Sequence, residues 1–151
     1  MIKNRLLTEA DYSFFRELIT DSEMWMQEEC TPDQLEEYLL SYKMYNGNWS
    51  VWTKENEKAG ISFHIEWSPS NEKPWLGTIL IHKKFRHGGL AKEVITQISD
   101  ELKRKGHKAL FAGCPLAQLE WLQFLGASGF EQLKMEKNTN GSDYMILVKP
   151  V

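Results

Sequence analysis

The chain has 151 residues, of which 42% are hydrophobic and 26% are charged, and its formal net charge is −3. This length suits one domain that buries its own core, and the composition is that of a soluble globular protein. The negative charge argues against generic binding to nucleic acid, and no apolar run reaches the roughly 18 residues that a membrane span requires.

The N-terminal segment lacks the long apolar core of a signal peptide. Cys30 and Cys114 lie far apart in the chain and form no C-x-x-C pair. This cysteine usage predicts a reduced, cytoplasmic setting without a zinc site, although a disulfide between the two cysteines stays open. We expect a single domain over residues 1–151.

Hydrophobic periodicity predicts the element order β-α-α-β-β-β-α-β-α-β-β. Thr8 and Thr31 each begin a capping box, which marks the start of a helix. A strand–helix–strand unit in the middle predicts at least one parallel strand pair. The predicted strands are residues 3–7, 49–54, 59–67, 75–82 and 108–113, and two more that start at 130 and 144. The predicted helices start at the two capping boxes, at Leu90 and at Leu116.

The strand over residues 59–67 alternates apolar and polar residues, so that Ser62, His64 and Glu66 share one face. His64 and Glu66 are therefore the candidates for a general base, with Glu66 able to relay a proton through water. The alternative is that this face is an ordinary solvent-exposed side of the strand.

Acidic residues gather between Glu17 and Tyr42, where no Lys, Arg or His occurs. Residues 82–92 show the reverse, with several basic side chains and no acid. One region therefore suits a cationic partner and the other an anionic one, unless both are simply solvated faces. Tryptophans also gather in the first half of the chain, and acids with aromatic rings are what a cationic amine pocket needs. These tryptophans, for which core packing is the ordinary role, are Trp25, Trp49, Trp52, Trp67 and Trp75.

The stretch HKKFRHGGLAKEV, residues 82–94, joins a predicted strand to a predicted helix. A helix N-terminus presents unpaired N–H groups and a partial positive charge, and glycines let a phosphate approach them. Lys92 in the first helical turn is unfavourable for an isolated helix but suits a bound anion. Neither GxxxxGK[ST] nor GxGxxG is present. The loop therefore predicts a phosphate site of another kind, the alternative being a tight strand-to-helix turn.

The segment ILIHKKFRHGGLAKEVI resembles the acyl-CoA motif of the GNAT N-acetyltransferases, an apolar strand followed by Arg/Gln-x-x-Gly-x-Gly/Ala. Arg86, Gly89 and Ala91 occupy its three positions. The segment WLQFLGASGFEQL is similar to the second motif of the family, which ends in Gly-Phe, here Gly129 and Phe130. The resemblance implies an α/β (α+β) GNAT fold. This is a mixed, twisted sheet of about six or seven strands, flanked by about four helices, with splayed central parallel strands.

The resemblance also implies a binding site for acetyl-CoA as co-substrate, without a metal. Backbone N–H groups from Arg86 to Ala91 would hold the CoA diphosphate, with nearby basic side chains offsetting its charge. The pantetheine arm would make main-chain bonds along the strand before the loop. Gln118 takes the place of an Asn that is common in the family. The expected cofactor-binding residues are Leu80, Ile81, Arg86, His87, Gly88, Gly89, Leu90, Ala91, Lys92 and Gln118.

Direct acetyl transfer to a primary amine is the implied activity. The acceptor would be a small, cationic molecule, a lysine side chain or an N-terminal amine. Leu125 departs from the family at a position that often holds a Tyr able to protonate the CoA thiolate. That departure leaves a non-catalytic acyl-CoA-binding or sensing module as the alternative, or a partner-binding domain that has lost CoA. Cys114 is expected to be a buried filler rather than a nucleophile. The sequence leaves the oligomeric state open, although homodimers are common in the family.

Overall fold

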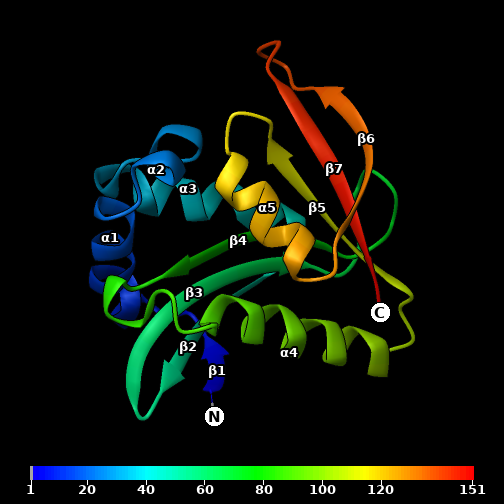
Figure 1. Ribbon diagram of the computed structural model, residues 1–151. Coiled ribbons are helices and arrows are strands. Elements are labelled where there is room, and N and C mark those ends of the chain that lie inside the picture. The colour runs from blue at the N-terminus through cyan, green and yellow to red at the C-terminus, as the bar shows by residue number, and fades with distance from the viewer. Residues whose placement is uncertain (1) are drawn as a thin grey trace. The chain divides into compact units, whose positions relative to one another are not determined.

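The computed structural model describes residues 2–151, and over this range the chain forms a mixed α/β fold with seven strands and five α-helices (Figure 1). The strands are β1 (Ile2–Leu6), β2 (Asn48–Lys54), β3 (Glu57–Ile65), β4 (Trp75–Ile81), β5 (Ala109–Pro115), β6 (Glu131–Lys137) and β7 (Asp143–Pro150). The helices are α1 (Tyr12–Thr20), α2 (Glu23–Glu28), α3 (Leu35–Tyr42), α4 (Leu90–Arg104) and α5 (Leu119–Ala127). Short 3₁₀ turns are η1 (Glu9–Asp11), η2 (Pro32–Gln34), η3 (Lys43–Tyr45) and η4 (Lys83–Phe85).

The chain divides into two compact units, which are described separately. The first unit contains residues 2–65 and 78–94, and the second contains residues 66–77 and 95–151. The strands β1-β2-β3-β4 are neighbours in the first unit, and β4-β5-β7-β6 are neighbours in the second, with β4 contributing one half to each.

In the first unit, β1, β2 and β3 form an antiparallel meander. Glu55 and Asn56 make the turn between β2 and β3, and both have a left-handed backbone with φ of 52° and 66°. Two such residues match the twist of a two-residue hairpin turn. Helices α1 and α3 bring their apolar faces together with β2, β3 and β4. The buried cluster is Phe15, Leu18, Ile19, Cys30, Leu35, Leu39, Val51, Ile61 and Leu80.

Both predicted capping boxes are present, although each opens a short 3₁₀ turn before the α-helix proper. In the first capping box, the Asp11 side chain is fully buried and also binds two cations. Its carboxylate accepts two hydrogen bonds from the Arg5 guanidinium, at 2.7 and 2.8 Å, and pairs with Lys58 Nζ at 2.8 Å. The Thr8 N–H also donates to it at 2.9 Å. The Arg5 bonds, with those from Lys58 and Thr8, hold the pKa of Asp11 far below its usual range despite burial.

In the second unit, β4 and β5 are parallel, which confirms the predicted parallel pair. Their ladder consists of Trp75 with Phe111 and Leu76 with Ala112. β5 pairs antiparallel with β7, and β7 with β6, the long hairpin that Figure 1 draws in orange and red.

The structure differs from the sequence expectation by one additional helix and by the ends of several elements. Helix α2 was not predicted, because six residues are too few to show helical periodicity. β3 ends at Ile65, so Glu66 lies beyond the strand instead of sharing a strand face with His64. Helix α5 begins at Leu119 rather than at Leu116. Within residues 2–151, no helix is long and apolar enough to cross a membrane.

The buried Asp11 cluster yields a stability prediction. Asp11→Ala leaves the Arg5 and Lys58 cations without their partner and removes the helix cap, so we expect a loss of about 3 kcal/mol in the free energy of unfolding. Because folding lowers the pKa of this group, its stabilisation is complete above the unfolded value of about 3.9 and is lost as pH falls toward the lower folded value. Chemical denaturation of both proteins at pH 7 and pH 3 measures this difference.

Asp33→Ala is the matched control, since Asp33 is an exposed acid at the start of η2. It should change stability by no more than about 0.5 kcal/mol. Equal effects of the two substitutions at pH 7 would contradict this account of Asp11.

Candidate active site

The loop between β4 and α4, residues 82–89, presents unpaired backbone amides. Among the described residues, the N–H groups of residues 87–91 donate to no backbone carbonyl. The Glu93 N–H makes a helical bond by donating to Gly89 O at 3.1 Å. These amides lie at the positive end of α4, where the helix dipole favours an anion, and the phosphate site that the sequence predicts there stays a prediction.

Backbone conformation keeps these amides open. His87 and Gly89 both have a left-handed backbone, with φ of 64° and 81°. A Cβ added at Gly89 would meet nothing within 4 Å, and one at Gly88 would meet only the Phe85 carbonyl oxygen at 3.7 Å. The space beside both glycines is therefore available to a ligand. Lys92 is exposed in the first turn of α4.

His82 fixes the start of the loop. Its Nδ1 accepts a hydrogen bond from the Lys84 N–H at 3.1 Å, which caps η4. Its Nε2 lies 2.7 Å from a carboxylate oxygen of Glu17, and its ring stacks on Phe14. Because Nδ1 is an acceptor, the ring proton of the neutral form belongs on Nε2, where it is donated to Glu17. Lys84 adds an ion pair with Glu57 at 2.7 Å.

Arg86 ties the loop to the segment between α1 and α2. Its Nε donates to the Ile81 carbonyl oxygen at 2.9 Å. Its Nη2 reaches the Asp21 carbonyl oxygen at 3.3 Å and the Ser22 hydroxyl at 3.4 Å. The guanidinium is thus engaged within the protein, which leaves the main-chain amides as the groups of this loop that are open to an anion. The Arg86 N–H donates to the Lys83 carbonyl oxygen at 3.4 Å, so the open amides start at His87 rather than at Arg86 as predicted. Main-chain bonds from Leu80 and Ile81 to the pantetheine arm stay a prediction.

An aromatic cluster also belongs to the first unit. The Trp25 indole N–H donates to the Thr78 hydroxyl of β4 at 3.3 Å, and its ring lies edge-on to Tyr38, 5.5 Å between centroids. Tyr38 and Tyr42 are 4.7 Å apart, and both lie 6.0 Å from Trp49. These four aromatic side chains are half-buried. Of the five tryptophans noted in the sequence, Trp25 and Trp49 are brought together here.

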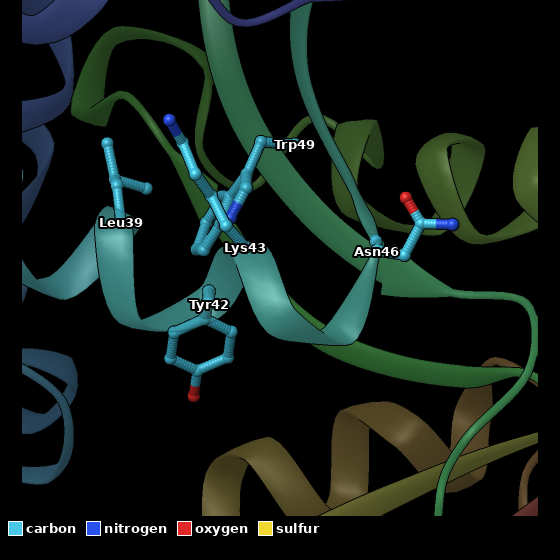
Figure 2. Close-up of a pocket in the computed structure, with 6 residues that line it drawn as sticks. Leu39, Tyr42, Lys43, Asn46 and Trp49 are labelled. Carbon is cyan, nitrogen blue, oxygen red and sulfur yellow. The ribbon is translucent and has the colours of Figure 1, made fainter.

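Two features adjoin the cluster. One is a pocket of about 190 Å³ between α3 and β2, where Figure 2 shows the Tyr42 hydroxyl and the Lys43 ammonium pointing in opposite directions. Its lining residues are Leu39, Tyr42, Lys43, Asn46, Gly47 and Trp49. The other feature is Glu29, which follows α2 and accepts hydrogen bonds from the Tyr38 hydroxyl at 3.0 Å and the Tyr42 hydroxyl at 3.4 Å. Desolvation raises the pKa of Glu29. Sequence reasoning did not single out Glu29 from its acidic neighbours.

The two base candidates fall in different units and in different surroundings. His64 lies in β3 opposite Asn48 and is buried, as is Ser62, so this strand face is not solvent-exposed. Glu66 belongs to the second unit, where its carboxylate lies 2.6 Å from His107 Nε2 and 3.5 Å from Lys105 Nζ. The His107 hydrogen bond, aided by Lys105, lowers the pKa of Glu66. The structure therefore does not bring the two together on one strand face.

The remaining sequence candidates lie in the second unit. Gln118 is the N-cap of α5, and Leu125 is buried in that helix. Cys114 is fully buried in β5, and burial raises its pKa to about 11, so the thiol stays protonated at neutral pH. This agrees with the filler role, and both cysteines are free. Within residues 2–151, no group of three or more His, Cys, Asp or Glu side chains is placed to hold a metal ion.

The model of the acetyltransferase (GNAT) family matches residues 12–130, which is most of the chain. The chain belongs to the GNAT family. It is therefore an N-acetyltransferase, as the motifs around Arg86 and Gly129 imply.

Relatives and solved structures agree with this assignment. The uncharacterized protein YkzC of Bacillus subtilis (strain 168) is 52% identical over 128 residues, which are 85% of this chain and 89% of that protein. A mutant of the spermidine N-acetyltransferase SpeG from Vibrio cholerae is 16% identical, with a TM-score of 0.74 over 99% of this chain and 93% of that one. The NatC complex bound to Gag peptide and CoA is 15% identical, with a TM-score of 0.70 over 99% and 98%. At these identities the solved structures establish the GNAT fold alone.

The role of His82 in this GNAT loop yields a second prediction. A long-range ¹H–¹⁵N spectrum of the histidine rings should show neutral His82 with its proton on Nε2 and an unprotonated Nδ1. Glu17→Gln should retain that form, because the Lys84 N–H still donates to Nδ1. A proton on Nδ1 in the neutral ring would contradict the proposed capping of η4.

Proposed function

We propose that the chain transfers the acetyl group of acetyl-CoA directly to a primary amine in the cytoplasm, as one GNAT domain over residues 1–151. The observation that carries this proposal is the set of unpaired amides at residues 87–91, at the start of α4, in a chain of this family. These main-chain groups would hold the CoA diphosphate. The exposed Lys92 and the free space beside Gly89 fit the same ligand.

Direct transfer requires no covalent bond between the acetyl group and the protein. The amine nitrogen forms a bond to the acyl carbon, the carbon–sulfur bond breaks, and the thiolate leaves with a proton from the medium. Positioning of the two reactants supplies much of the rate. The attacking amine must first lose its proton, for which His64 and Glu66 remain the proposed base and water-orienting groups. The lowered pKa makes Glu66 a weak base, which suits it better to orienting water.

A thiol-release assay with a panel of primary amines tests the activity. Acetyl-CoA and an accepted amine should yield free CoA in proportion to acetylated amine, without added metal. Leu125 in place of Tyr favours one competing function, an acyl-CoA-binding module without turnover. Tight acetyl-CoA binding without amine-dependent thiol release would support that module and contradict the proposed transfer.

Gly89→Trp tests where the diphosphate binds. The large side chain would enter the open space beside the amides, so we expect acetyl-CoA binding to weaken at least about tenfold by calorimetry. Gly141→Trp is the matched control, because Gly141 has a similar φ of 87° and equally open surroundings but lies in the turn between β6 and β7.

The control substitution introduces the same backbone strain, so it separates strain from loss of the site. The control should bind acetyl-CoA as the wild type does. Undiminished binding by Gly89→Trp, with the fold intact, would overturn the assignment of residues 87–91 as the diphosphate site.

A further inference from the structure

Glu29 is a half-buried carboxylate without a cationic partner among residues 2–151. Both phenol hydrogen bonds reach the same oxygen, Oε1, from Tyr38 and Tyr42. Within residues 2–151, no Lys, Arg or His forms an ion pair with Glu29, and none of the described side chains donates to its Oε2. A desolvated carboxylate of this kind costs stability unless a positive charge compensates it.

The surroundings of Glu29 suit an organic ammonium group. Tyr38 and Tyr42 donate to its carboxylate and also present aromatic rings, and Trp25 stands edge-on to Tyr38. Aromatic faces beside a carboxylate attract alkylammonium ions through the ring quadrupole and through charge. The nearby Lys43 ammonium points away from the Tyr42 hydroxyl, which donates to Glu29 (Figure 2).

The same cluster is connected to β4. The Trp25 indole donates to Thr78, two residues before Leu80, where the sequence motif predicts main-chain contacts with the pantetheine arm. The Arg86 guanidinium holds the loop that carries the amides against Asp21 and Ser22, just before α2. The carboxylate and the diphosphate site are therefore positioned by neighbouring segments of one unit.

We propose that Glu29, with Tyr38, Tyr42 and Trp25, binds an ammonium group of the acceptor that does not react, so that the acceptor is a diamine or polyamine. This inference rests on the proposed N-acetyltransferase function. An ammonium paired with a carboxylate keeps its proton, whereas the attacking amine must be neutral. One amine cannot meet both conditions, so the acceptor needs a second basic nitrogen. A monoamine held at Glu29 would be bound unproductively.

The experiment compares 1,4-diaminobutane with n-butylamine as acceptors for the wild type, Glu29→Gln and Glu28→Gln, with free CoA as the readout. The wild type should prefer the diamine in kcat/KM by at least about tenfold, the value of one charge-assisted hydrogen bond. Glu29→Gln should lose that preference through a higher KM for the diamine. Its amide oxygen still accepts from the phenols, so the fold should be retained. Glu28→Gln, which removes an adjacent exposed charge, should keep the preference.

Three kinetic outcomes overturn the proposal: a wild type without preference for the diamine, a Glu29→Gln variant that keeps the preference, and an equal fall in kcat for both acceptors in Glu29→Gln. The last result would make Glu29 the general base instead. Calorimetric titration of 1,4-diaminobutane separates this inference from the activity. Binding to the wild type that weakens about tenfold in Glu29→Gln alone supports the site even if no amine is acetylated. Absence of binding to the wild type overturns it.

Discussion

Unpaired backbone amides at the start of α4 are the constraint on which the site depends. A strand that ends at Ile81 and a helix that begins at Leu90 leave eight residues to turn the chain. Left-handed backbone at His87 and Gly89 makes that turn without closing the N–H groups onto the protein's own carbonyls. Amides fixed in this way are ready for an anion, because the chain has already lost the conformational entropy that ordering the loop costs.

The contacts that hold the loop also organise the acidic region of the first unit. His82 binds Glu17 of α1, and Arg86 reaches the residues that precede α2. The acids of this unit differ in their partners, since Glu17 pairs with His82 and Glu57 pairs with the Lys84 ammonium, whereas Glu29 has no cationic partner among the described residues. Loop residues of the predicted CoA motif thus contact α1 and the segment before α2 directly.

The sequence predicted the fold class and located the glycine loop between β4 and α4, because both depend on local patterns. Alternating and helical periodicity located most elements, and glycine spacing with the Gly-Phe motif identified the family that the comparisons then established. Side-chain partners were harder to predict, because they join distant segments. The pairing of Glu66 with His107 depends on how residues 41 positions apart meet. Glu29 is indistinguishable from Glu28 in the sequence, and only the positions of Tyr38 and Tyr42 separate a half-buried carboxylate from an exposed one.

A crystal structure of the chain with CoA tests the account most directly. We expect the diphosphate oxygens within about 3.2 Å of backbone nitrogens from residues 87–91, with the Arg86 side chain still bound to the Ile81 carbonyl. A diphosphate bound elsewhere, or amides of residues 87–91 closed onto protein carbonyls, would contradict it.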